Sequence, residues 1–246
     1  MFEEFEEILK VGEKRISRLA YTVWDIYTYP QIVHYNQINS SFRFSYDLHS
    51  TLFGSSNEKI IENYDPKGEI SLSFDLEWLD LVQNYFTNFK VMDKSASGKE
   101  MNTFLCMELQ SDDFKPLENY QAQIMDDSLI TKLSFKQRML FSEFGGGGVG
   151  IVKERQLIGV AFAPHIIQNN RFSFAIIRGV RVAQEHRNKG YGYDVSAKMC
   201  DVLFSRGVEF ITLWVEESNL PAVKIYQKMG FKTKDKVYGT DCVKQK

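Results

Sequence analysis

Cysteine is scarce in this chain, and its scarcity excludes two kinds of small protein. Among 246 residues there are 3 cysteines, an odd number, at Cys106, Cys200 and Cys242. Cysteines so few and so widely spaced form neither a disulfide framework nor a cysteine-rich metal cluster. We therefore expect a reducing, cytoplasmic setting and no metal ion in the site.

Long apolar runs and a large excess of one charge are also missing. No stretch of the sequence reaches the roughly 18 apolar residues that a membrane span needs. The N-terminal segment MFEEFEEILKVGEKR is acidic and amphipathic, whereas an export signal starts basic and then turns apolar. Because the net charge is only −2, the chain has no general attraction to nucleic acid or to an anionic membrane. We expect neither as a partner.

The second half of the sequence alternates between strand and helix patterns. A hairpin is expected around the turn 154–156, and a long apolar strand over 172–182. A helix over 190–206 then ends at Gly207, which is typical of a helix C-terminus. A buried strand over 210–215, a helix over 220–229 and a further strand from Phe231 follow. This order predicts an α/β fold whose mixed sheet is connected by crossover helices.

The first half is less regular, and the chain is expected to divide near Asp112-Asp113 into domains 1–112 and 113–246. Residues 3–27 show helical spacing interrupted at Gly12, which fits a kinked helix or a helix followed by a strand. Residues 31–63 have weak periodicity and receive no assignment. The patterns then predict a strand over 70–74, a helix over 75–88, and strands over 89–92 and 102–109. Beyond the boundary they predict helical structure over 117–144, in one piece or two.

Two glycine-containing loops are candidates for anion binding. Gly145 to Gly148 form a run of four glycines, but no Gly-Lys-Ser/Thr follows, so a flexible turn is the better interpretation. The second loop comes between a buried strand and a helix and reads Arg187, Asn188, Lys189, Gly190, Tyr191, Gly192. A helix N-terminus offers unpaired amides, glycines allow close approach, and two cations add charge. This combination predicts a site for an anion such as pyrophosphate.

A second motif follows this loop, and together the two resemble the GCN5-related N-acetyltransferase superfamily. The first signature of that family is a strand followed by Arg/Gln-x-x-Gly-x-Gly/Ala at the start of a helix, which matches Arg187 to Gly192. The family's usual proline is Gln184 here. The second signature matches a later strand and the residues after it, Leu213, Trp214, Val215, Asn219, Ala222, Tyr226, Gly230 and Phe231. The resemblance covers about residues 150–240.

The resemblance implies the N-acyltransferase fold with splayed central parallel strands, and the first half of the chain is expected to form a second α/β domain before it. It also implies transfer of an acetyl or other short acyl group from acyl-CoA to a primary amine, by direct attack in a ternary complex. Acetyl-CoA would be the co-substrate, and the acceptor would be a small-molecule or peptide amine. A homodimer is one possible assembly. A catalytically inactive acyl-CoA-binding sensor or interaction protein is the alternative.

The family's roles carry over to particular residues. Backbone groups of Val180, Arg181 and Val182 would bind the pantetheine arm and polarise the thioester carbonyl. The loop from Arg187 to Gly192 would hold the pyrophosphate, and Asn219 would bind pantetheine or position the next helix. Tyr226 would protonate the leaving thiolate, or else only pack against CoA.

The general base and the first half of the chain are less defined by the resemblance. Glu216 and Glu217 are candidates for the base, with Glu217 preferred as catalytic; the alternative interpretation is that both are solvated charges. His186 fits a surface residue and Cys200 a core residue, so a covalent cysteine route is not expected.

The order of elements over 70–109 echoes the order over 210–231. It suggests a degenerate copy of the same fold that lacks the phosphate loop, with an unrelated α+β domain as the alternative.

Overall fold

The computed structural model describes residues 5–91, 101–131, 133–135, 138–139 and 148–245. These residues form two compact units, and the chain passes between the units more than once. The first unit contains Met1–Cys106, Trp214–Asn219 and Thr233–Lys246, and the second contains Met107–Leu213 and Leu220–Lys232. The predicted contiguous boundary between residues 112 and 113 lies close to the first of these passages, and stays a prediction as a domain boundary.

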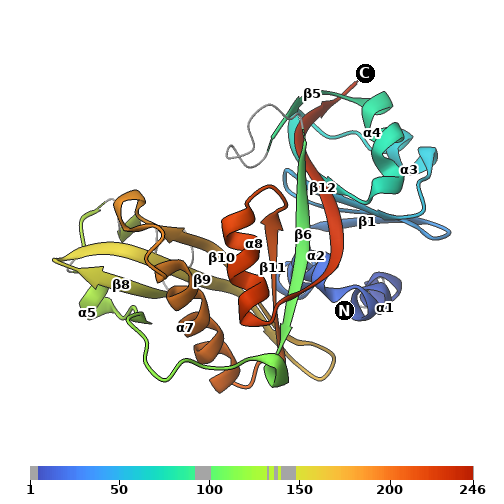
Figure 1. Ribbon diagram of the computed structural model, residues 1–246. Coiled ribbons are helices and arrows are strands. Elements are labelled where there is room, and N and C mark those ends of the chain that lie inside the picture. The colour runs from blue at the N-terminus through green and yellow to red at the C-terminus, as the bar shows by residue number, and fades with distance from the viewer. Residues whose placement is uncertain (1–4, 92–100, 132, 136–137, 140–147, 246) are drawn as a thin grey trace. The chain divides into compact units, whose positions relative to one another are not determined.

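The first unit has two N-terminal helices followed by a small α/β arrangement (Figure 1). Its elements in chain order are α1 (Glu6–Lys14), α2 (Ile16–Thr28), β1 (Val33–Ile38), β2 (Ser41–Tyr46), β3 (His49–Gly54), α3 (Glu58–Glu62), β4 (Glu69–Phe74), the 3₁₀ turn η2 (Leu76–Trp78), α4 (Leu79–Tyr85) and β5 (Phe86–Lys90). The strand order is β1-β2-β3-β4-β12, and β5 pairs with β12 on the other side. Strand β12 (Lys232–Lys244) comes from the far end of the sequence.

The core of the first unit explains why its strands alternate as they do. Alternating side chains of β4 point into a cluster that includes Ile70, Leu72 and Phe74, and Trp78 of η2 packs against them. The Trp78 indole Nε1 donates a hydrogen bond of 2.8 Å to the carbonyl oxygen of Gly54. The buried indole is thereby satisfied at its only polar atom, as a tryptophan in a core requires.

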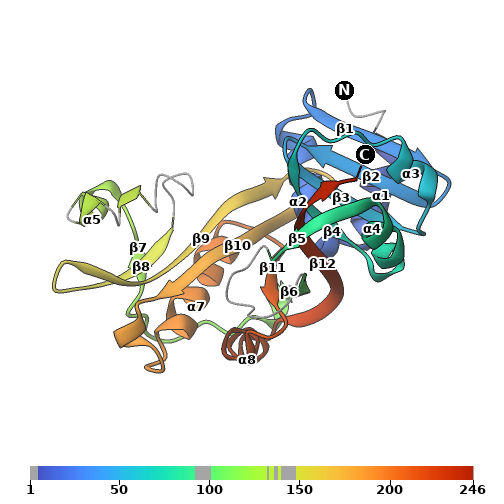
Figure 2. The ribbon, with the colours of Figure 1, turned by 90° about the horizontal axis from the view of Figure 1, so that it is seen from above.

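The second unit contains the long strands β9 and β10 and the helices α7 and α8 (Figures 1 and 2). Its elements in chain order are the end of β6 (Asn102–Gln110), η3 (Ser111–Asp113), β7 (Gln123–Ile124), α5 (Asp127–Ile130), β8 (Val149–Lys153), β9 (Gln156–Gln168), β10 (Ser173–Val182), η4 (Gln184–His186), α7 (Tyr191–Ser205), the start of β11 (Phe210–Glu216) and α8 (Leu220–Met229). The strand order is β6-β11-β10-β9-β8-β7. The pair β10–β11 is parallel, whereas β9 pairs antiparallel with both β8 and β10.

The two units repeat one order of elements. In the first, two hairpin connections lead through β1, β2 and β3, α3 crosses to the parallel neighbour β4, and α4 follows. In the second, β8, β9 and β10 are joined in the same way, α7 crosses to the parallel neighbour β11, and α8 follows. In each unit the strand next to the second parallel strand comes from another part of the sequence: β12 beside β4, and β6 beside β11.

The mixed α/β fold and the elements of the second half agree with the sequence predictions, but several details in the first half differ. The N-terminal helix breaks at Arg15 and not at Gly12, and two helices result. The predicted helix over 75–88 ends at Tyr85, and the next strand begins at Phe86. The unassigned residues 31–63 form β1, β2, β3 and α3. The glycines 145–147 lie outside the described residues.

The predicted helix over 117–144 is wrong for its first ten residues, and a tertiary contact gives the reason. Residues 117–126 are extended or irregular and include the short strand β7. The amides of Gln121 and Ala122 donate to the two carboxylate oxygens of Asp194, at 3.0 and 2.7 Å. Amides bound to a distant side chain in this way are not available to a helix.

Candidate functional site

Strand β10 and the parallel strand β11 pair over only a short distance. Their ladder joins Phe174, Ala175 and Ile176 to residues 210–212, although β10 continues to Val182. The register of β10 against β9 also shifts between Ile176 and Arg178 and again before Arg181. Within the described residues, β11 therefore does not pair with the last part of β10. The splayed parallel strands of the sequence prediction are consistent with this short ladder.

The last residues of β10 lie where the sequence predicted backbone contacts to pantetheine. Val182 pairs with Gly159 and Arg181 with Val160, so one edge of this segment belongs to β9. Gly179 has a φ of 63°, a left-handed conformation that glycine adopts without strain and that breaks the regular strand just before Val180. The segment 180–182 is thus anchored on one side only by strand pairing.

The loop after β10 turns sharply into α7. Asn188 has a φ of 61° and Gly190 a φ of 84°, so two residues within the loop take the left-handed conformation. Asparagine and glycine are the residue types that adopt it most readily. Gly190 is the N-cap of α7, and no side chain caps the helix there. The first amides of α7 consequently remain available as donors at the positive end of the helix dipole.

Cationic side chains border this helix start. Arg187 donates from Nε to the carbonyl oxygen of Val182 at 3.2 Å, and Lys189 donates from Nζ to the carbonyl oxygen of Glu185 at 3.1 Å. These bonds fold the loop onto itself and leave the guanidinium and ammonium groups exposed to solvent. A backbone carbonyl does not neutralise a cation, so both charges can still attract an anion.

The start of α7 is held in place from several sides. The Asp194 carboxylate in its first turn is buried and binds the two amides of residues 121 and 122. The Tyr191 hydroxyl accepts a hydrogen bond of 2.6 Å from Lys153 Nζ on β8. A Cβ at Gly192 would lie 3.2 Å from Cδ1 of Ile225 on α8. Gly192 therefore allows the two helices to approach closely, while Gly190 provides the turn.

The two loop glycines can be distinguished by their surroundings. No atom lies within 4 Å of the position that a Cβ would take at Gly190. The space beside Gly190 is open, which a close approach of a bound anion to the backbone requires. The structure therefore contains a helix N-terminus that combines available amides, adjacent cations and open space.

Tyr226 lies on α8 and is nearly buried within the second unit, with 7% of its surface exposed. Its ring meets Phe231 edge to face, with the ring centroids 5.6 Å apart. Burial raises the pKa of the Tyr226 hydroxyl, and the nearby Cys200 thiol adds to the rise. The hydroxyl therefore keeps its proton throughout the neutral pH range. Cys200 is itself fully buried on α7, as predicted for a core residue.

Asn219, Glu216 and Glu217 belong to the first unit and surround the end of β11. The backbone amide of Asn219 donates to the carbonyl oxygen of Glu216 at 2.9 Å, just before α8 begins. The Glu217 carboxylate is exposed and paired with Lys236 of β12. Glu216 is 2% exposed; its Oε2 accepts from the Ser218 amide at 2.7 Å, and its buried Oε1 has no hydrogen-bond partner among the described residues.

The structure brings the loop residues from Arg187 to Gly192 together with the end of β10 in the second unit. It places the two carboxylates in unlike surroundings, which the sequence pattern did not distinguish. Sequence reasoning also missed Asp194, although an acidic residue in the first turn of a helix is a recognisable signal. Among the described residues, no group of three or more metal-ligating side chains gathers, and no helix has the length and apolarity that a membrane crossing requires.

The helix α3 of the first unit occupies the place in the order of elements that α7 holds in the second. It has only 5 residues, and its N-cap Asn57 accepts a hydrogen bond of 3.1 Å from the amide of Lys59. One of its first amides is thus already bound to a side chain, and no glycine-rich cationic loop precedes it. This helix start lacks the features that distinguish α7.

Comparisons with known proteins give one family and one fold. The model of the acetyltransferase (GNAT) family matches residues 106–231. A Drosophila protein of known structure aligns over 99% of this chain and 97% of its own, with a TM-score of 0.66 and 14% identity. A GCN5-related N-acetyltransferase-like protein from Streptococcus suis aligns over 96% of this chain and all of its own length, with a TM-score of 0.56 and 14% identity.

A GCN5-related N-acetyltransferase from Kribbella flavida aligns over 92% of this chain and 94% of its own, with a TM-score of 0.56 and 12% identity. At these identities the likeness shows the fold alone. No curated protein matches the chain.

Proposed function

Because the chain belongs to the acetyltransferase (GNAT) family, we propose that it transfers an acetyl or other short acyl group from acyl-CoA to a primary amine. The start of α7 is the observation that carries the proposal. It combines uncapped amides, the left-handed Gly190, open space beside it, and the cations Arg187 and Lys189. The pyrophosphate of CoA is an anion that suits such a helix start.

The residues after Gly179 supply the other half of the donor site in this proposal. Backbone groups of 180–182 bind the pantetheine arm along the part of β10 that β11 does not pair with. A backbone amide there polarises the thioester carbonyl. Asn219, at the start of α8, contributes to holding pantetheine or the helix.

The transfer itself forms one bond and breaks another. The amine nitrogen attacks the thioester carbonyl carbon, the C–N bond forms, the C–S bond breaks, and one proton moves from nitrogen to the CoA sulfur. Binding both reactants together supplies proximity and orientation, so no covalent enzyme intermediate is needed. The buried thiol of Cys200 has its pKa raised by burial, which does not suit a nucleophile.

Tyr226 is the group that we assign to the leaving sulfur. A hydroxyl that holds its proton at neutral pH can donate a hydrogen bond to a developing thiolate. We assign the base to Glu216 in preference to Glu217, because the buried Oε1 of Glu216 has no described partner while Glu217 is exposed and paired with Lys236. The sequence prediction for Glu217 stays a prediction, and parallel Glu216→Gln and Glu217→Gln variants test the two assignments.

The first unit is, in this proposal, a copy of the same fold that does not bind CoA. The repeated order of elements and the self-capped start of α3 support this proposal. One chain would then bind one acyl-CoA.

The decisive experiment measures both binding and turnover. Calorimetric titration of the full chain with CoA is expected to give one site per chain. Release of free thiol from acetyl-CoA, followed with a thiol-reactive dye and a panel of primary amines, is expected for at least one amine. CoA binding without turnover on any amine would support the sensor alternative, and absence of CoA binding would overturn the proposal.

A further inference from the structure

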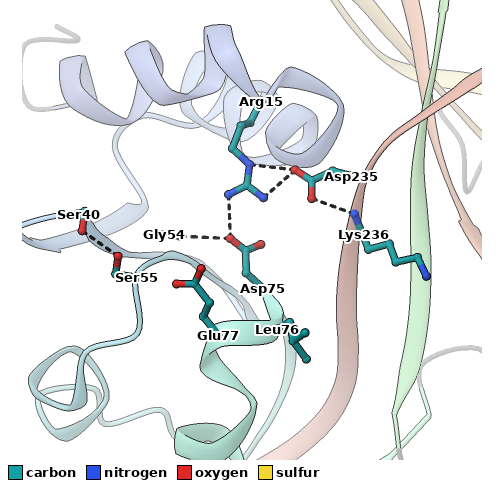
Figure 3. Close-up of a pocket in the computed structure, with 9 residues that line it drawn as sticks. All are labelled: Arg15, Ser40, Gly54, Ser55, Asp75, Leu76, Glu77, Asp235 and Lys236. Carbon is teal, nitrogen blue, oxygen red and sulfur yellow. Dashed lines mark hydrogen bonds and ion pairs between the residues drawn. The ribbon is translucent and has the colours of Figure 1, made fainter.

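A cavity of about 500 Å³ opens in the first unit, at the carboxyl ends of the parallel strands β3 and β4 (Figure 3). The junction of α1 and α2, the turn between β1 and β2, the start of η2 and the early part of β12 complete its lining. The carboxyl ends of parallel strands are where α/β folds bind small ligands. Nothing in the proposed chemistry at α7 uses this cavity.

One wall of the cavity is a fixed network of charges. Arg15 donates to Asp235 Oδ2 from Nε at 2.9 Å and from Nη2 at 2.7 Å, and to Asp75 Oδ2 from Nη1 at 2.9 Å. Asp75 also accepts from Arg18 Nε at 2.9 Å and from the Gly54 amide at 3.2 Å. Because each of these carboxylates is already bound by donors of the protein, this wall gives shape to the cavity and has little capacity left for a cation.

Glu77 is different from the other two carboxylates in the lining. It is exposed, and in the part of the chain that the structure describes it has neither an ion pair nor a hydrogen bond. Figure 3 shows its carboxylate turned towards the space that Asp75 and Gly54 border. The other charges of the lining have partners: Arg15 pairs with Asp75 and Asp235, Arg18 also pairs with Asp75, and Lys236 pairs with Glu217. Among the described residues Glu77 is therefore the lining charge without a counter-ion, and it favours a positively charged ligand.

The rest of the lining limits the size and kind of that ligand. The hydroxyls of Ser40 and Ser55 lie 3.1 Å apart at the rim and can exchange hydrogen bonds with a polar group. Leu76 is 59% exposed and gives a small apolar surface beside Glu77. Such a lining fits a compact aliphatic amine that carries a hydroxyl better than a bare ion.

We propose that this cavity binds a small primary amine, with its ammonium group on Glu77 and its polar end on Ser40 and Ser55. The inference rests on the charge and the lining of a cavity within the first unit and is independent of CoA. It makes Glu77 a binding residue for the amine.

The test uses three probes of similar size and different charge on the full chain without CoA. Ethanolamine is a cation, ethylene glycol is neutral and glycolate is an anion. Titrations followed by protein chemical shifts are expected to show saturable binding of ethanolamine alone. Glu77→Gln is expected to weaken that binding roughly fivefold, as for a partly exposed ion pair. Asp80→Asn is the matched control, because Asp80 is an exposed carboxylate early in α4 outside the lining.

The outcomes separate this inference from the proposed function. Absence of ethanolamine binding, equal binding of glycolate, or equal effects of Glu77→Gln and Asp80→Asn would overturn the amine site. CoA titration of the same samples reports on the α7 loop independently. Loss of amine binding with intact CoA binding therefore refutes the cavity alone, whereas failure to bind CoA refutes the proposed function.

Discussion

Replacement of Gly190 by alanine tests the phosphate loop most directly. Gly190 has a φ of 84°, and an L-residue in the left-handed conformation costs about 1–2 kcal/mol. No protein atom lies within 4 Å of the added Cβ, so steric overlap adds nothing to this cost. The expected loss of unfolding free energy is therefore about 1–2 kcal/mol, and the chain should still fold.

This replacement should weaken CoA binding by more than its loss of unfolding free energy suggests. The new methyl group would occupy the open space beside Gly190, where the proposed function places a phosphate of CoA. A hydrogen bond to a charged group contributes about 1.5–3 kcal/mol, so the loss of one such bond weakens CoA binding at least tenfold. Calorimetric titration at constant low salt measures this change, and denaturant unfolding of the same samples measures the stability.

Gly207 provides a matched control at the other end of α7. Its φ is 82°, and the nearest atom to a Cβ there, Nε2 of Gln168, is 3.7 Å away. Gly207→Ala should therefore lose as much stability as Gly190→Ala but retain CoA affinity. Equal CoA affinities for the two variants would refute the reasoning, because the affinity would then follow stability and not the position of the loop.

The remaining predictions concern single side chains. Tyr226→Phe should lower kcat roughly 100-fold in steady-state assays and leave the Kd for CoA unchanged, because in the proposed mechanism the lost hydroxyl serves the leaving sulfur. Glu216→Gln should lower kcat by a similar factor without loss of stability, since it removes a buried charge whose Oε1 has no described partner. Glu217→Gln should change neither kcat nor stability. A loss of activity confined to the Glu217 variant would move the base to Glu217. Burial raises the pKa of Asp25 from 3.8 to about 7, so the folded state holds that proton more tightly than the unfolded chain. Unfolding free energy should then fall as pH rises from about 4 to about 7, and Asp25→Asn should flatten this part of the denaturation profile, whereas an equal slope in both proteins would contradict it.

Apart from residues 117–126, the sequence predicted the second unit well because its local signals agree with its tertiary contacts. The loop glycine Gly190 and the terminal glycine Gly207 are both at left-handed positions that bound α7, as their places in the pattern indicate. The predicted apolar face of α7 and the predicted buried strand β11 are both buried in the structure. Short-range chemistry sufficed to predict these boundaries.

The first unit was predicted less well because its signals are set by distant residues. The turns of its two hairpins use Asn39 and Asp47 in left-handed conformations, where a glycine would have been a clearer signal. At the break between α1 and α2, the guanidinium of Arg15 binds Asp75 and Asp235, which are far away in the sequence. The pattern suggested that the Asp75 side chain caps the following helix, but this side chain makes no capping hydrogen bond there.

The strands that pair with β12 could not be predicted from the periodicity of the sequence. Its alternating residues predict a strand, but only the structure shows that it pairs with β4 and β5 of the first unit. In the second unit the corresponding place beside β11 is taken by β6, and the Thr212 hydroxyl donates to the carbonyl oxygen of Met107 at 3.0 Å. A pattern of period two specifies which face is buried and leaves the partner strand open.

The contrast between α3 and α7 gives a physical reason for proposing one CoA site in a chain with a repeated order of elements. An anion at a helix start competes with any side chain that already binds the first amides. Asn57 does so at α3, whereas Gly190 has no side chain to do so at α7. The acidic residue in the first turn differs as well: Asp194 is buried and bound by amides of residues 121 and 122, whereas Glu58 of α3 is exposed. Of these two helix starts, α7 therefore has the amides that no side chain binds, and it is the one to which we assign the pyrophosphate.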